Sequence, residues 1–193
     1  PATVFTDDNE DDDAKIMLLD TEVYLISTKE VNVASYTQLM AAVINNANIK
    51  LTADITLSQE VTIQNNKIVT IDLNGHTLNR NLTTATDKGH VLTVASGSQL
   101  TINDSSDNPD TPEYDGTGVI KGAYTANGGA IDNAGTLIFN AGTIKTHQCT
   151  DKGAAIWNRS GATATITGGV VTGNTSTNNG AAIWNEGTLC MQG

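Results

Sequence analysis

One phrase recurs three times in the C-terminal part of the chain: GGAIDN at residues 128–133, GAAIWN at 153–158 and GAAIWN at 180–185. Its isoleucines, Ile131, Ile156 and Ile183, are 25 and 27 residues apart. A period between about 20 and 50 residues is typical of chains built from stacked structural units. Side chains in such a stack recur in columns, so candidate functional residues have to be compared column by column.

Each copy of the phrase is followed by a run that predicts a β-strand. In these runs apolar residues and Thr alternate, and Gly and Asn separate one run from the next, which indicates strands and turns. Successive side chains of a strand point to opposite faces. Stacking of the copies therefore predicts three inward columns: Ile131, Ile156 and Ile183; Leu137, Ala164 and Leu189; and Phe139, Ile166 and Met191.

A fourth column consists of asparagines, Asn133, Asn158 and Asn185. Stacked Asn side chains at a turn tolerate left-handed backbone and hydrogen-bond along their column. The apolar strip of one repeat is small, and it is buried only between neighbouring repeats about 4.8 Å away. The pattern predicts an all-β fold, a parallel β-helix (β-solenoid), in which the Asn column is structural.

The chain divides into three predicted segments. Residues 49–193 are expected to form the parallel β-helix, with about six rungs at the observed period. Residues 35–48 are expected to form a capping α-helix, with Ser35 or Thr37 as N-cap. Residues 1–34 are expected to contain an acidic leader and N-terminal strands, at residues 16–19 and 23–26, that pack along the stack. The stretch 103–117 has no strand pattern and is expected to project as a loop, where function often lies.

Composition excludes several classes of partner. The formal net charge of −11 argues against nucleic acid, which requires a basic footprint, and against anionic membranes. No stretch approaches the roughly 20 apolar residues of a membrane span. The two cysteines, Cys149 and Cys190, are expected to be free thiols. The chain starts at Pro1 and ends within a repeat at Gly193, so we expect a processed or excised fragment that is truncated at its C-terminal end.

The run Asp7–Asp13 is the one candidate for a cation site. Clustered carboxylates suit calcium, but the run lacks the Gly and the spaced Glu of an EF-hand loop. A solvated acidic leader is the simpler interpretation. His76, His90 and His147 have no metal-ligand partners at a recognisable spacing. The prediction is therefore no cofactor and no metal, with calcium at residues 7–13 as the alternative.

The segments KLTADITL (50–57), VTIDLNGHTL (69–78) and LTINDSS (100–106), together with the recurring phrase, resemble right-handed parallel β-helix proteins of the bacterial surface. The helix expected at residues 36–44 resembles the capping helix of that family. The resemblance covers about residues 35–193 and implies an adhesin-like, secreted or cell-surface protein. The same fold also hosts pectate lyases and polygalacturonases, so the fold alone does not decide the function.

Trp157 and Trp184 are the only tryptophans and share one outward column with Asp132. Two indoles one rung apart suggest a stacking platform for a sugar or another aromatic partner, with Asp132 below them in the column. Packing under a loop or against a neighbouring chain is the alternative interpretation of these tryptophans.

An enzyme on this fold would need two or three converging carboxylates. Asp72, Asp104 and Asp132 are the conceivable set, but they share no evident column, and Arg80 and Arg159 stand in turns. His76 is expected to be a turn residue. The prediction is that no residue is catalytic.

The sequence thus predicts a non-catalytic binding module that contacts glycans or a host surface through its tryptophan column. A polysaccharide-degrading lyase or hydrolase is the alternative. End-to-end homodimers are a further expectation, because the last rung leaves Leu189 and Met191 uncovered beside a strand edge.

Overall fold

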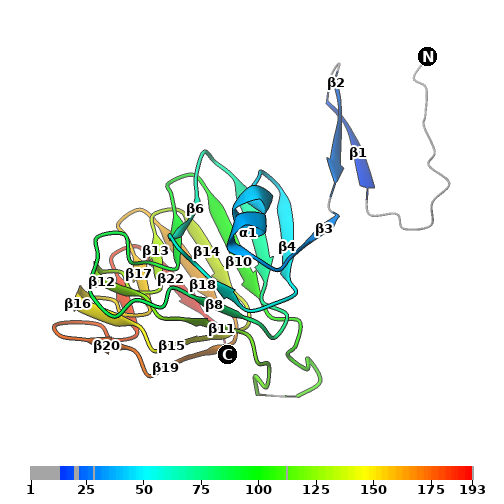
Figure 1. Ribbon diagram of the computed structural model, residues 1–193. Helices are drawn as coiled ribbons and strands as arrows, with labels where there is room; N and C mark the ends of the chain where they lie inside the picture. The colour runs from blue at the N-terminus through cyan, green and yellow to red at the C-terminus, as the bar shows by residue number, and fades with distance from the viewer. Residues whose placement is uncertain (1–13, 20–21, 28, 112, 193) are drawn as a thin grey trace, which may run out of the picture.

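The computed structural model describes residues 14–19, 22–27, 29–111 and 113–192, and nearly all of its strands lie in parallel β-sheets (Figure 1). The largest sheet has seven strands, in the spatial order β3 (Glu30–Val33), β4 (Ala47–Leu51), β7 (Ile68–Asp72), β10 (Gln99–Asn103), β14 (Thr136–Phe139), β18 (Thr163–Ile166) and β22 (Thr188–Met191).

Three further parallel sheets accompany the seven-stranded one. The second sheet consists of β5 (Ile55–Thr56), β8 (Thr77–Asn79), β11 (Val119–Lys121), β15 (Thr143–Lys145) and β19 (Val170–Thr172). The third consists of β6 (Val61–Ile63), β9 (Leu92–Val94), β13 (Ile131–Asn133), β17 (Ile156–Asn158) and β21 (Ile183–Asn185). The fourth consists of β12 (Tyr124–Asn127), β16 (Gln148–Lys152) and β20 (Thr175–Ser176).

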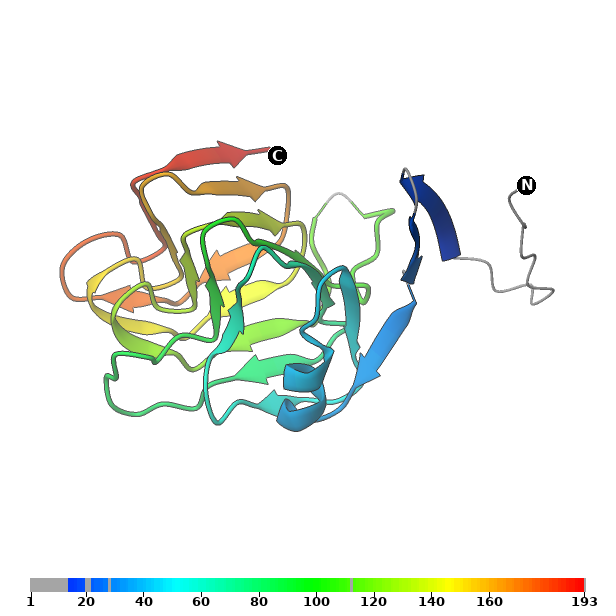
Figure 2. The ribbon, with the colours of Figure 1, turned by 90° about the horizontal axis from the view of Figure 1, so that it is seen from above.

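Except for β3 and β4, neighbouring strands of a parallel sheet are separated along the chain by strands of the other sheets. The chain therefore passes through the sheets in turn. We use the word layer for one complete passage of the chain through the sheets. Figure 2 shows the layers stacked from the helix end of the molecule to the C-terminal strand. The predicted all-β class and the parallel strands are confirmed, and the arrangement is compatible with a β-solenoid.

The register of the strands matches the predicted columns. Ile131 pairs with Ile156 and Ile156 with Ile183, and the columns that begin at Leu137 and Phe139 are likewise in register. The isoleucine column also continues backwards through Leu92 to Val61, which the recurring phrase does not reveal. Most of these side chains are fully buried and belong to one hydrophobic core. Burial of apolar surface between layers is thus what holds the stack together.

The single helix of the described residues, α1 (Tyr36–Ala42), is shorter than the predicted 35–48. Ser35, one of the two predicted candidates, is its N-cap and accepts a hydrogen bond from the Gln38 backbone N–H. Leu39 is fully buried in the core beside β3 and β4. In Figure 2 the helix lies at the end of the stack, which is where a cap covers apolar surface. Met40, the next residue of the helix, is 40% exposed.

The stack begins before the helix, which the sequence did not predict. Strand β3 pairs in parallel with β4, although it precedes α1 in the chain. The expected N-terminal strands do form, as β1 (Ala14–Leu19) and β2 (Glu22–Ser27), but they make a separate antiparallel hairpin rather than joining the stack (Figure 1). The two strands pair along their full length of six residues and with no strand of the parallel sheets. The acidic run at residues 7–13 lies outside the described residues.

The asparagine column forms a ladder of side-chain hydrogen bonds along the ends of β13, β17 and β21. Asn133 Nδ2 donates to Asn158 Oδ1 at 2.7 Å, and Asn158 Nδ2 donates to Asn185 Oδ1 at 2.7 Å. The same amide nitrogens also donate to the carbonyls of Thr163 and Thr188. Asn133 and Asn158 are fully buried. Because each amide joins two layers and satisfies a backbone carbonyl, the ladder helps to fix the register.

Replacing Asn158 with Ala is expected to lower the free energy of unfolding by about 2–4 kcal/mol, because the buried Asn133 amide loses its Asn158 acceptor, and the Asn185 side chain and the Thr188 carbonyl lose their donor. Asn140 is the matched control: it is exposed, and its side chain joins Asn103 and Thr167 at 2.8 Å each. Asn140→Ala should cost less than about 1 kcal/mol. Urea unfolding followed by circular dichroism measures both. Equal losses in the two variants would show that the buried ladder has no special role.

Candidate functional site

The tryptophan column occupies the outward face of the third sheet. Asp132 pairs with Trp157 in the next layer, and Trp157 pairs with Trp184 in the layer after it. The column continues backwards through Thr93 to Thr62. Register alone brings the three predicted site residues together, because side chains at one strand position always meet across a parallel pair. This placement agrees with the column that the sequence predicts.

Each indole leans onto a glycine of the preceding layer. A Cβ atom at Gly128 would lie 3.1 Å from Trp157 Cβ, and one at Gly153 would lie 3.1 Å from Trp184 Cβ. Both glycines also have positive φ, +71° and +68°, a conformation that side-chain-bearing residues rarely adopt. The first Gly of the recurring phrase thus leaves room for the tryptophan of the next layer. Both tryptophans are half-buried as a result, rather than standing clear of the surface.

Charged side chains border both rings. The Arg159 guanidinium lies 4.1 Å from the centre of the Trp157 ring, and Lys152 Nζ lies 4.7 Å from the centre of the Trp184 ring. The Trp157 indole N–H donates to Glu186 Oε2 at 2.8 Å. Cation–π contacts of this kind hold the cation over the aromatic face. The indoles therefore form the floor of a polar surface with charged edges.

Asp132 anchors this surface from below. It is buried, and its two carboxylate oxygens accept from Arg159 Nε at 2.5 Å and Arg159 Nη2 at 2.6 Å. A two-point contact of this type fixes the plane of the guanidinium and hence its position over Trp157. His90 Nε2 lies 3.8 Å from the same carboxylate, and His90 Nδ1 contacts the Gly128 carbonyl oxygen at 2.5 Å. Asp132 is thus a positioning residue for Arg159 in this arrangement.

Two pKa values follow from these contacts. The pKa of Glu186 lies below its ordinary value, first because Trp157 donates a hydrogen bond to it and then because the Trp184 indole acts on the same carboxylate. The Trp184 Nε1 atom is buried and makes no hydrogen bond of good geometry itself. The pKa of Arg159 lies above its ordinary value, chiefly because of its hydrogen bonds to Asp132. Both groups are therefore charged at neutral pH.

Four of these residues were missed as site residues: His90, Lys152, Arg159 and Glu186. A signal existed for two of them, since Arg159 and Glu186 directly follow the Asn in the second and third copies of the phrase. Equivalent repeat positions with opposite charges lie close together in a stack. His90 and Lys152 lie outside the phrase and reach the site only through folding.

The other candidate carboxylates serve the projecting loop. Asp72 Oδ1 accepts from the Asn74 and Ser105 backbone N–H groups, and Asp104 accepts from the backbone N–H groups of Gly75 and Gly118 and from the Tyr114 hydroxyl. Burial by itself would raise the pKa of Asp104, but these hydrogen bonds outweigh it and lower the pKa. The structure thus brings Asp72 and Asp104 to adjacent layers. There the two carboxylates hold a turn and a loop in place through their hydrogen bonds.

His76 lies in a turn and its Nδ1 is 3.5 Å from Asp54. His147 is fully buried, with Nδ1 accepting from the Ala123 backbone N–H at 3.0 Å and Nε2 facing the Ile120 carbonyl oxygen at 2.9 Å. These partners require a neutral ring protonated on Nε2. Burial lowers the pKa of His147 to about 4.

Both cysteines are free, as expected. Cys149 is buried and its thiol donates to the Ala126 and Lys152 carbonyl oxygens, whereas Cys190 is exposed. Across the described ranges, no group of three or more His, Cys, Asp and Glu side chains is arranged to hold a metal ion. Within the same part of the chain, no helix has the length and apolar character needed to cross a bilayer.

The chain was compared with models of known protein families, with curated proteins and with solved structures, and no match was found in any of the three comparisons.

Acidification should destabilise the fold through His147. Its folded pKa of about 4 lies below the ordinary 6.5 of the unfolded chain, so the unfolded state takes up the proton first. The contribution is fully present above about pH 6.5 and is lost as the pH falls toward 4. At about 1.4 kcal/mol for each pKa unit, the loss is on the order of 3 kcal/mol.

Urea unfolding at a series of pH values measures this loss. The control is His147→Gln, which keeps a donor and an acceptor but does not titrate in this range. It should be less stable at pH 7 and should show a shallower fall in stability between pH 6.5 and 4. The same slope in both proteins would mean that other groups cause the acid sensitivity.

Proposed function

We propose that residues 49–193 form a right-handed parallel β-helix of about six rungs, with β3 as an additional strand at its helix-capped end. Crossover connections between parallel strands are right-handed in nearly all known sheets, which supports the handedness. The in-register columns and the sequential use of the sheets support the rung arrangement. The resemblance to adhesin-like bacterial surface proteins fits this architecture and suggests a secreted or cell-surface location.

The function proposed for this module is non-catalytic glycan binding through the outward face of the third sheet. The observation that carries it is the Trp157–Trp184 column bordered by Arg159, Lys152 and Glu186. Sugars are recognised by aromatic surface combined with a few well-placed polar groups. The surface carries two cations, Arg159 and Lys152, and two carboxylates, Glu186 and Asp132. Their formal charges balance, so this surface suits a neutral sugar.

A polysaccharide-degrading enzyme is the less favoured alternative. General acid catalysis by a carboxyl group requires a raised pKa, whereas the pKa of Asp104 is lowered. Asp132 accepts hydrogen bonds from Nε and Nη2 of Arg159, and Asp72 accepts two backbone hydrogen bonds. Each of the three acidic groups therefore already has a structural role, which is a reason to prefer binding over catalysis.

End-to-end association of this chain is a second proposal. Strands β19, β20, β21 and β22 lie at the ends of their sheets, and Met191 is 66% exposed. Unpaired strand edges next to apolar side chains favour pairing with another chain. Light scattering should then show a concentration-dependent dimer, which Met191→Lys should weaken. A strictly monomeric chain at high concentration would contradict the proposal.

A glycan array tests the binding function. The chain should bind a subset of neutral glycans, and Trp157→Ala/Trp184→Ala should abolish that binding. Glu186→Gln should weaken it by roughly three- to tenfold, because one charge-assisted contact on the exposed rim is lost. Circular dichroism establishes that each variant is folded.

The control variant is Ile68→Ala, which removes an exposed apolar side chain, 47% accessible, from a different sheet. Its binding should equal that of the parent chain. If neither the parent nor the control binds any glycan, or if the folded Trp variant binds as well as the parent, the proposed function is wrong.

A further inference from the structure

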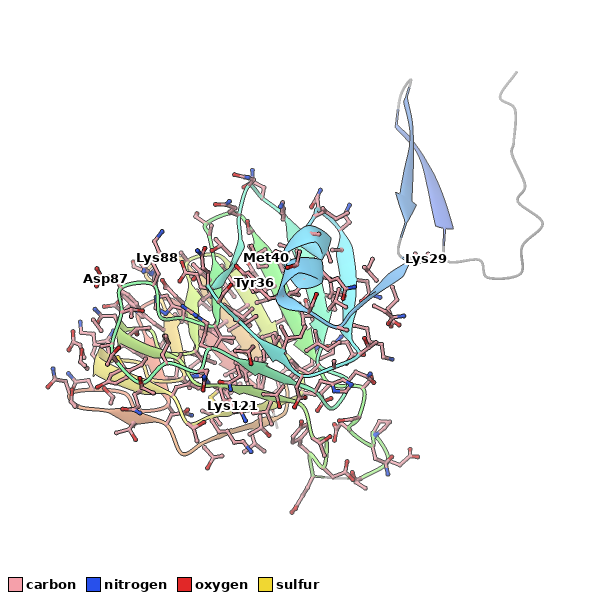
Figure 3. The ribbon with its side chains drawn as sticks, in the orientation of Figure 1. Lys29, Tyr36, Met40, Asp87, Lys88 and Lys121 are labelled. Carbon is pink, nitrogen blue, oxygen red and sulfur yellow. The ribbon has the colours of Figure 1, made fainter. Side chains whose placement is uncertain are left out.

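A cavity lies near the capping helix and includes Thr62 on the outward face of the third sheet. Its volume is about 500 Å³, within the size range of small-molecule sites. Figure 3 labels two of its residues, Met40 on α1 and Lys88 in the loop that precedes β9. Its lining consists of Met40, Gln59, Glu60, Thr62, Gln64, Arg80, Thr86 and Lys88.

The cavity contains a buried guanidinium whose nearest partners are neutral. Arg80 is 8% exposed, and it donates to the carbonyl oxygens of Leu57, His90 and Lys88 at 2.9, 2.9 and 3.0 Å. Among the described residues, no carboxylate lies within ion-pair distance of it. An arginine has five N–H donors, so donors remain for a ligand. Its fixed orientation makes Arg80 suitable for binding a carboxylate.

A buried acceptor lies in the same cavity. Glu60 Oε2 is inaccessible to solvent and has no hydrogen-bond partner. Unpaired buried carboxylate oxygens are unfavourable, and a ligand that donates a hydrogen bond removes that penalty. The neutral side chains of the lining, from Gln59, Thr62, Gln64 and Thr86, supply further donors and acceptors. Such a lining suits a ligand with several hydroxyl groups better than an apolar one.

We propose that this cavity binds a sugar acid, with its carboxylate against Arg80 and Lys88 and one of its hydroxyls donating to Glu60 Oε2. The lining carries two cations and one carboxylate, an excess of positive charge in a chain whose formal net charge is −11. Local positive charge in an acidic protein selects for an anionic group. This differs from the charge-balanced tryptophan column, so the two sites would recognise different sugars.

The two sites are connected by the register of the third sheet. Thr62, in the cavity, belongs to the outward column that continues through Thr93 and Asp132 to Trp157. Three strand spacings separate Thr62 from Trp157, which is about 14 Å. A glycan of several units could therefore place an acidic sugar in the cavity and neutral sugars on the tryptophans. This inference rests on the proposed function in that the ligand is a glycan.

The test is an NMR titration of the whole ¹⁵N-labelled chain with D-glucuronate, with D-glucose and acetate as matched ligands at constant ionic strength. The backbone amides of Thr62, Gln64 and Lys88 report on the cavity, and the indole N–H groups of Trp157 and Trp184 report on the tryptophan column. Glucuronate should shift the cavity amides saturably. Glucose and acetate should each bind at least about tenfold more weakly, because each lacks one of the two kinds of contact.

Lys88→Gln removes one cation from an exposed loop position and should weaken glucuronate binding by about tenfold. The matched control is Lys121→Gln, which makes the same change on β11, outside the cavity lining, and should bind within about twofold of the parent. The inference is overturned if glucuronate leaves the cavity amides unshifted, if glucose or acetate binds equally well, or if Lys88→Gln binds like the control.

The failure of this inference can be told apart from that of the proposed function. Cavity shifts that persist in Trp157→Ala/Trp184→Ala, together with a blank glycan array, would support the cavity site and count against the tryptophan site. Neutral glycans that bind the array and shift only the indole signals would do the reverse.

Discussion

The in-register pairing of parallel strands between layers is the constraint on which the rest of the structure depends. Side chains alternate along a strand, so a slip of one residue would exchange the two faces. Such a slip in β17 would bury Trp157 and expose Ile156, which is now fully buried. The buried asparagine ladder opposes it, because Asn133 and Asn158 find their partners in only one register. Core packing and the outward face are thus determined together.

This coupling explains why the candidate site has the form it has. The register that aligns the inward column also aligns the outward column. Any residue at the second position of β13, β17 or β21 therefore belongs to the outward column. Asp132, Trp157 and Trp184 are neighbours for this reason alone. The polar border is different, because Lys152 and Glu186 extend from the segments on either side of the column. A repeat protein can therefore vary its recognition surface without disturbing its core, as long as glycine keeps room for the indole.

The N-cap of the helix is Ser35, one of the two predicted candidates. The recurring phrase allowed the columns and the strand register to be predicted correctly. It did not reveal β3, because that strand precedes the helix and carries no copy of the phrase. The helix expected to reach Ile44 ends at Ala42, because apolar spacing alone does not mark the end of a helix. Asn46 has a φ of +57°, and such left-handed backbone marks the turn into β4.

The sequence by itself determined which residues face inward, since a period of two along each strand and a regular spacing between strands are local properties of the chain. It also determined the tryptophan–aspartate column, which follows from the same period and the same spacing between strands. Only the tertiary structure decided what surrounds that column and what lines the cavity near the helix. Arg80, Glu60 and Met40 come from different segments of irregular spacing, and no local pattern encodes the distances between them. Such contacts arise only when the layers stack.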